Sequence, residues 1–97
     1  MVFLDVDEVE RVESAANFLR IQTRDNEYLA RETLSSLAAR LSAGSFVQIY
    51  RSHLVRLKAI RRIGLDSEGK LSVFLRTGAG LRISLAYRED LRHLMIE

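Results

Sequence analysis

The sequence contains no cysteine, no proline and no long hydrophobic run. Without cysteine, disulfide bonds and thiolate metal sites are excluded, and nothing in the chain requires an oxidising compartment. No apolar run approaches the roughly 20 residues that cross a bilayer. There is no visible linker, and 97 residues are enough for one hydrophobic core. We therefore expect a single domain over residues 1–97, located in the cytoplasm and not inserted in a membrane.

Carboxylates are absent from one long stretch in the middle of the chain, between Thr33 and Leu65. The same stretch carries six basic side chains: Arg40, Arg51, Arg56, Lys58, Arg61 and Arg62. Residues 1–13, in contrast, hold five carboxylates, so the net charge of +2 hides an uneven distribution. Thirteen of the fifteen basic residues are arginine, whose guanidinium can grip phosphate or guanine with two parallel hydrogen bonds. A GC-rich genome explains the high arginine content equally well. The positions of the arginines must therefore indicate whether they bind an anionic partner.

Catalytic and metal-binding motifs are also missing. The two histidines, His53 and His93, lie forty residues apart, and there is no HExxH sequence, nucleophile elbow or glycine-rich phosphate loop. The acidic residues near the start are best interpreted as a solvated edge that discourages strand pairing. We predict that the chain is not an enzyme and that it uses neither a cofactor nor a metal ion.

Hydrophobic periodicity predicts a mainly β domain with two short helices. Alternating patterns predict strands over Phe18–Thr23, Tyr28–Arg31, Phe46–Ile49, Ile60–Leu65, Leu71–Thr77 and Leu81–Ser84. Val9 and Val12 keep an apolar pattern going before Ser14–Asn17 interrupts it. Thr33 is a capping-type residue before a helical pattern over Leu34–Leu41. A second helix is predicted over Tyr87–Glu97, with Tyr87, Leu91, Leu94 and Met95 on one face.

Arg51 is the strongest candidate for a contact with a partner, because the strand before it delivers its side chain to a turn. A surface salt bridge is the alternative for this residue. Arg56, Lys58 and Arg61 fit phosphate-positioning groups, since clustered positive charge gives affinity without sequence information. His53 either satisfies a backbone carbonyl or contacts nucleic acid, and the sequence leaves both possibilities open.

Three motifs in order resemble the LytTR DNA-binding domain of bacterial transcriptional regulators. The segment DEVERVESAANFLRI at Asp7–Ile21 is similar to the family's opening pattern "DEI.yIEa.gNYv.i". The segment YLARETLSSL at Tyr28–Leu37 is similar to "y..retL..L", and FVQIYRSHLV at Phe46–Val55 is similar to "F.riHRS.iVN". The resemblance covers nearly the whole chain.

This resemblance implies an elongated β fold of about ten short strands in small sheets. Loops, rather than a recognition helix, would enter two successive major grooves of double-stranded DNA and contact the minor groove between them. The corresponding loops here are residues 15–18, 50–53 and 84–88. The implied DNA contacts are Asn17, Arg51 and Arg88, with Arg20, Arg56 and Arg61 on phosphates. His53 and Lys58 complete the set of expected DNA-binding residues.

The resemblance also implies partners. The chain would be the C-terminal output domain of a longer regulator, of two-component type, behind a receiver or another sensor domain, and it would bind promoter DNA as a homodimer. One departure is Leu85-Ala86, which stands where the family commonly has a basic pair. These apolar residues favour an alternative, in which the domain has weakened or lost DNA binding and serves dimerisation or partner docking.

Overall fold

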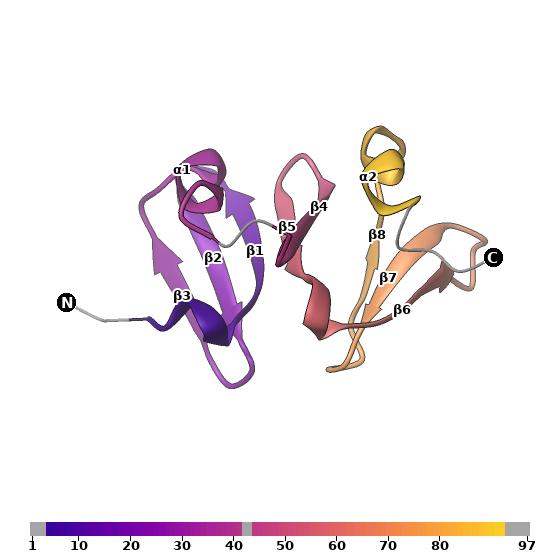
Figure 1. Ribbon diagram of the computed structural model, residues 1–97, viewed down its shortest axis with the longest axis horizontal. Coiled ribbons are helices and arrows are strands. Elements are labelled where there is room, and N and C mark those ends of the chain that lie inside the picture. The colour runs from indigo at the N-terminus through magenta and orange to yellow at the C-terminus, as the bar shows by residue number, and fades with distance from the viewer. Residues whose placement is uncertain (1–3, 42–43, 93–97) are drawn as a thin grey trace.

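The computed structural model describes residues 4–41 and 44–92. They form an elongated body of 44 × 25 × 24 Å that contains two antiparallel sheets side by side (Figure 1). The strand order is β3-β2-β1-β5-β4 in the first sheet and β6-β7-β8 in the second. This arrangement confirms the predicted mainly β fold with two short helices and small sheets. The described residues contain eight strands, compared with the ten or so that the family resemblance implied.

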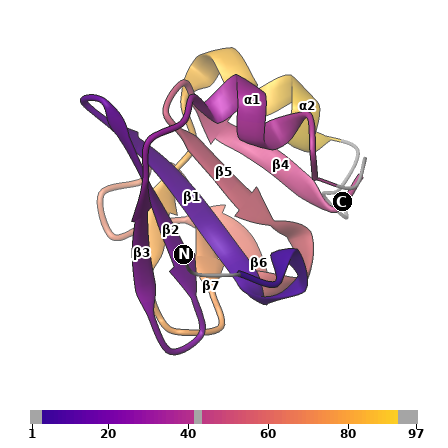
Figure 2. The same ribbon diagram turned by 90° about the vertical axis from the view of Figure 1, so that its left-hand side faces the viewer.

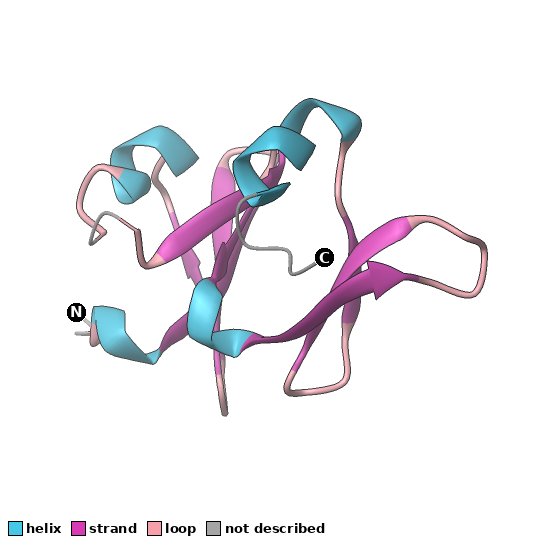
Figure 3. Cartoon of the chain, turned by 45° about the vertical axis from the view of Figure 1, so that its right-hand side comes forward, coloured by secondary structure: helices cyan, strands magenta, loops and turns pink. Residues whose placement is uncertain are grey.

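The elements follow one another along the chain without long connections. The strands are β1 (Val9–Ala15), β2 (Phe18–Thr23), β3 (Glu27–Ala30), β4 (Phe46–Tyr50), β5 (His53–Arg56), β6 (Ile60–Leu65), β7 (Leu71–Leu75) and β8 (Gly80–Arg82). The helices are α1 (Leu34–Ala38) and α2 (Arg88–Arg92), and the 3₁₀ helices are η1 (Val6–Glu8), η2 (Leu57–Ala59) and η3 (Leu85–Tyr87). Figure 3 shows α1, η3 and α2 on one side of the sheets, with η1 and η2 on the other.

Strand β1 is longer than the sequence pattern predicted. Val9 and Val12 are both buried although they are three residues apart, which is an odd spacing for one face of a strand. The pairing of β1 with β2 shifts register between Val9 and Arg11, so an irregularity of the β-bulge type restores both valines to the same face. The prediction that Ser14–Asn17 breaks the pattern was wrong for Ser14 and Ala15, which remain paired in β1.

The first helix is shorter than predicted, and the second can be compared with its prediction only as far as Arg92. Thr33 caps α1 as expected, since its hydroxyl accepts a hydrogen bond from the backbone N–H of Ser36. The α-helix ends at Ala38, however, and the chain continues in tighter turns as far as Leu41. The second predicted helix is η3 followed by α2, while residues 93–97, including His93, Leu94 and Met95, lie outside the described residues.

Two hydrophobic clusters hold the fold together, and β5 belongs to both. Leu54 packs with Val12, Leu19 and α1 residue Leu37 on one face of the first sheet. Val55, the next residue, packs on the opposite face against residues of the second sheet, η2 and α2. This alternation follows from the pleat, which turns successive side chains to opposite faces. The β4–β5 hairpin therefore joins the two halves of the molecule (Figure 1).

The β6–β7 hairpin matches its prediction in its first strand and in its glycine-containing loop, while β7 ends at Leu75, two residues earlier than predicted. The Asp66 carboxylate accepts hydrogen bonds from the backbone N–H groups of Lys70 and Glu68, both at 2.9 Å, and the Arg82 guanidinium lies 3.2 Å away. The bond from Lys70 is the main reason that the pKa of Asp66 is lowered, and Arg82 acts in the same direction. Gly69 adopts a φ of +78°, a left-handed conformation that glycine permits.

Candidate nucleic-acid interface

The three loops that the sequence singled out lie together at one edge of the molecule. The backbone N–H of Ser14, beside the first loop, donates to the carbonyl of Ser52 in the second loop at 2.8 Å. The N–H of Ser84, which begins the third loop, donates to the carbonyl of Ile49 at 2.8 Å. Backbone hydrogen bonds thus connect residues 15–18, 50–53 and 84–88 in a row. Figure 2 shows this row at the top, from the β1–β2 turn through the β4–β5 turn to η3.

A side-chain contact also links the second and third loops. The Gln48 amide nitrogen lies 3.2 Å from the carbonyl oxygen of Arg51 and 3.5 Å from the hydroxyl of Tyr87. Gln48 is half-buried in β4. This strand of the first sheet therefore holds Arg51 of the second loop and Tyr87 of the third loop close to each other. The packing of the fold therefore determines how the second and third loops lie relative to each other.

Asn17, Arg51 and Arg88 present their side chains from this edge, one from each loop. All three are exposed. In residues 4–41 and 44–92, none of these three side chains makes a hydrogen bond or ion pair with the protein. Asn17 follows Ala16, whose φ of +54° makes the tight turn between β1 and β2. The three side chains therefore present amide and guanidinium donors to solvent from backbone positions that the fold holds in place.

His53 makes contacts inside the protein that the sequence did not predict. Its Nε2 atom lies 2.7 Å from a carboxylate oxygen of Glu13, the residue that pairs with it across β1 and β5. Its Nδ1 atom lies 3.2 Å from the hydroxyl of Ser52, and the ring meets the Tyr50 ring edge-on. The partner is thus a carboxylate rather than the backbone carbonyl considered above. These contacts hold the second loop against β1.

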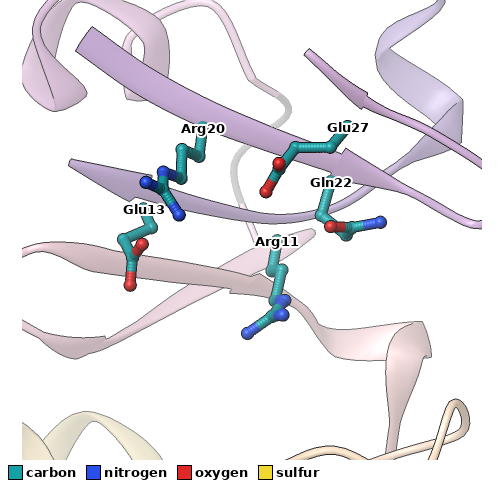
Figure 4. A pocket seen from close by; sticks show the side chains of 5 residues that line it. All are labelled: Arg11, Glu13, Arg20, Gln22 and Glu27. Atoms are coloured by element: carbon teal, nitrogen blue, oxygen red, sulfur yellow. The ribbon is translucent and has the colours of Figure 1, made fainter. Parts of the chain in front are cut away.

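Arg20 lies on the open face of the first sheet, opposite the face whose residues Leu19 and Ile21 pack with α1. It pairs with Glu13 across β1 and β2. A shallow groove on this face is lined by Arg11, Glu13, Arg20, Gln22 and Glu27 (Figure 4). Two arginines and two glutamates make this groove close to neutral. Arg20 is exposed and three residues from Asn17, so it adjoins the loop edge without belonging to it.

Arg56 is tied to the protein through its guanidinium. Its Nε donates to the backbone carbonyl of Val9, and its Nη2 donates to that of Val6 in η1. The guanidinium carbon also lies 4.6 Å from the centre of the Phe46 ring. These contacts join β5 to the start of the chain and leave fewer donors for a phosphate.

Replacing Arg56 by alanine is expected to lower the free energy of unfolding by about 1–3 kcal/mol, because two backbone carbonyls lose a charged donor. Urea denaturation of the variant and the wild-type chain measures the difference. The control is Arg61→Ala, an exposed position at which we expect a change within about 0.5 kcal/mol. If Arg56→Ala is as stable as the wild type, then Arg56 does not stabilise the fold.

Lys58 and Arg61 lie away from the three loops. Strand β5 leads from the second loop to η2, which contains Lys58, and Arg61 is the second residue of β6. Both side chains are exposed. At about 3.3 Å per residue, the four-residue strand separates η2 from the second loop by well over 10 Å. Figure 1 shows η2 at the lower edge, opposite the β4–β5 turn.

Arg31 is a residue near the interface that the sequence reading missed. It follows β3, and its guanidinium carbon lies 5.6 Å from the centre of the Phe18 ring in the first loop. Its neighbour Ala30 pairs with Leu19, which places Arg31 beside the β1–β2 turn. The motif at Tyr28–Leu37 contained this arginine, but nothing in that pattern alone indicated its proximity to Asn17.

Other kinds of site find little support in the described part of the chain. No group of three or more His, Asp or Glu residues there is placed to bind a metal ion. No helix among the same residues is long and apolar enough to cross a membrane.

Comparison with known proteins places the chain in a family. A model of the LytTr DNA-binding domain matches residues 1–96. The chain belongs to this family. A solved LytTr DNA-binding domain from a Bacillus cereus protein superposes with a TM-score of 0.80, over 91% of this chain and 81% of that one, at 19% identity. The LytTr fold is therefore confirmed. Because this family is defined by DNA binding and by no reaction, it agrees with the absence of enzyme motifs.

Two longer proteins are similar in sequence to this chain. The heme-containing CO-sensing transcriptional regulator RcoM 1 of Paraburkholderia xenovorans is 31% identical over 72 residues, which are 73% of this chain and 27% of that protein. An uncharacterized response regulatory protein of Vibrio cholerae is 28% identical over 95 residues, or 98% of this chain and 39% of that protein. The chain thus spans less than half of the length of either relative.

Proposed function

We propose that this LytTr domain binds double-stranded promoter DNA sequence-specifically, by inserting its three adjacent loops into the grooves. The observation that carries the proposal is the hydrogen-bonded row of loops, each with one exposed polar side chain directed to solvent: Asn17, Arg51 and Arg88. Arginine can bind guanine O6 and N7 bidentately, and asparagine can bind adenine N6 and N7 in the same way. A rigid edge with such groups can therefore distinguish bases.

Phosphate contacts position the domain and supply most of the salt-dependent affinity. Arg20 and Arg31 are suited to this role, because they are exposed beside the first loop. Lys58 and Arg61 would reach phosphates only further along the duplex, since they lie at the other end of β5. Arg56 mainly stabilises the fold, because its guanidinium already donates hydrogen bonds to the carbonyls of Val6 and Val9. His53 positions the second loop through Glu13.

The domain acts as the output module of a transcriptional regulator of two-component type, with a receiver or other sensor domain before it in the full-length protein. The names of the relatives support this context, since one is a transcriptional regulator and the other a response regulatory protein. Two copies bind paired repeats in a promoter. The alternative is a dimerisation or partner-docking module with weakened or lost DNA binding, and it rests on the exposed apolar residues Leu85 and Ala86.

A selection from random duplex DNA tests this function. We expect the 97-residue chain to enrich a defined motif, and its affinity for the selected duplex to fall as salt rises, with a slope near −0.9 per phosphate contacted. Fluorescence anisotropy with labelled selected and scrambled duplexes provides the measurement. If no motif is enriched at low salt, or if both duplexes bind equally, the domain does not read sequence and the docking alternative is favoured.

A further inference from the structure

Leu85 is more exposed than any other large hydrophobic side chain among the described residues, at 75%. It belongs to neither of the two hydrophobic clusters. The backbone around it is nevertheless held firmly, because Ile83 and Leu91 on either side are buried and the N–H of Ser84 is bonded to Ile49. The fold therefore holds Leu85 out in solvent and does not let it turn inward.

Exposed apolar side chains occur in each of the three loops. Single exposed apolar residues are ordinary on protein surfaces, but here Phe18, Tyr50 and Leu85 project from the same edge. The Phe18 ring lies under the Arg31 guanidinium, and the Tyr50 ring meets His53 edge-on. Leu85, in contrast, is 75% exposed and packs into neither hydrophobic cluster. Its apolar surface is thus the part of the edge that a bound partner would cover.

The floor of the major groove offers one apolar group, the 5-methyl group of thymine. We propose that Leu85, with Ala86 beside it, packs against a thymine methyl, so that the third loop reads sequence by apolar contact. The proposal rests on the DNA-binding function proposed above. A leucine side chain has no donor for guanine, so the hydrogen-bonded contacts at other base pairs fall to Arg51 and Arg88. The expected operator therefore contains thymine opposite the third loop.

Deoxyuridine, which lacks the methyl group but pairs like thymine, isolates this contact. In the duplex selected by the wild-type chain, each thymine is replaced in turn, and the dissociation constant is measured for wild type and for Leu85→Ala. We expect at least one replacement to weaken wild-type binding about fourfold, the value of one buried methyl group. The same replacement should change binding of Leu85→Ala by less than twofold.

Leu65→Ala is the matched control, because Leu65 is 64% exposed in β6 and outside the three loops. It should respond to deoxyuridine as the wild type does. The inference is overturned if the wild type binds every substituted duplex equally, or if Leu85→Ala remains as sensitive as wild type. In both cases the selected motif still stands, so DNA binding survives. If no duplex is selected at all, the proposed function fails and the inference fails with it.

Discussion

Replacing Leu19 by alanine is expected to lower the free energy of unfolding by about 2–5 kcal/mol, because the substitution leaves a cavity in a packed core. Leu19 is fully buried in the cluster formed by β1, β2 and α1, and it follows the first loop by one residue. Domains of this size have only about 5–15 kcal/mol of stability. Urea denaturation followed by circular dichroism measures the change, and we expect a markedly earlier midpoint.

Leu29→Ala is the matched control for this prediction. Leu29 lies in β3, opposite Arg20 of β2, but it is 65% exposed on the open face of the sheet. The same chemical change should alter the free energy of unfolding by no more than about 0.5 kcal/mol. If the two leucine variants lose equal stability, then the side chain of Leu29 is buried in solution by contact with another molecule.

Arg51→Ala is expected to weaken binding to a selected duplex about 10- to 100-fold, while leaving stability nearly unchanged. The guanidinium is exposed at the centre of the loop row and makes no ion pair in the described part of the chain. Loss of a bidentate base contact costs about 1–3 kcal/mol. Fluorescence anisotropy at fixed salt measures the affinity, and urea denaturation checks that the variant is folded.

The control for Arg51 is Arg24→Ala. Arg24 is also exposed, but it lies in the connection between β2 and β3, at the opposite end of β2 from the first loop. The variant removes the same charge from the molecule and should change affinity less than twofold. Equal losses in the two variants would show that bulk charge, and no directed contact, governs the binding. A lower salt slope with unchanged base preference would assign Arg51 to a phosphate.

Local patterns in the sequence predicted the hairpins well. The predicted strand Phe18–Thr23 is β2, and the predicted loop Asp66–Lys70 joins β6 to β7. Both predictions succeed because the strands of a hairpin pair with residues that are close in the sequence. Long-range pairing was less accessible. The pairing of β1 with β5 joins residues about forty positions apart. The register shift that buries both Val9 and Val12 arises in the pairing of β1 with β2, and the alternating pattern does not reveal it.

The roles of individual arginines were the least predictable from sequence. Arg51 lies within the motif at Phe46–Val55 and Arg56 directly follows it, yet Arg51 is exposed in a turn and Arg56 binds two backbone carbonyls. Charge predicts that a side chain is attracted to phosphate, but it does not reveal which carbonyls of the protein lie within reach. Arg31 illustrates the converse, since only the pairing of β2 with β3 brings it to the first loop.

The double membership of β5 has a consequence for how the interface forms. A shift of this strand by one residue would exchange Leu54 and Val55 between the two clusters and disrupt both at once. The hairpin that carries Arg51 thus has one permitted alignment, enforced from each side. Mutations that loosen either half of the molecule should misalign the same turn. The proposed DNA-binding edge should consequently lose its alignment after a destabilising mutation in either cluster, even one far from the three loops.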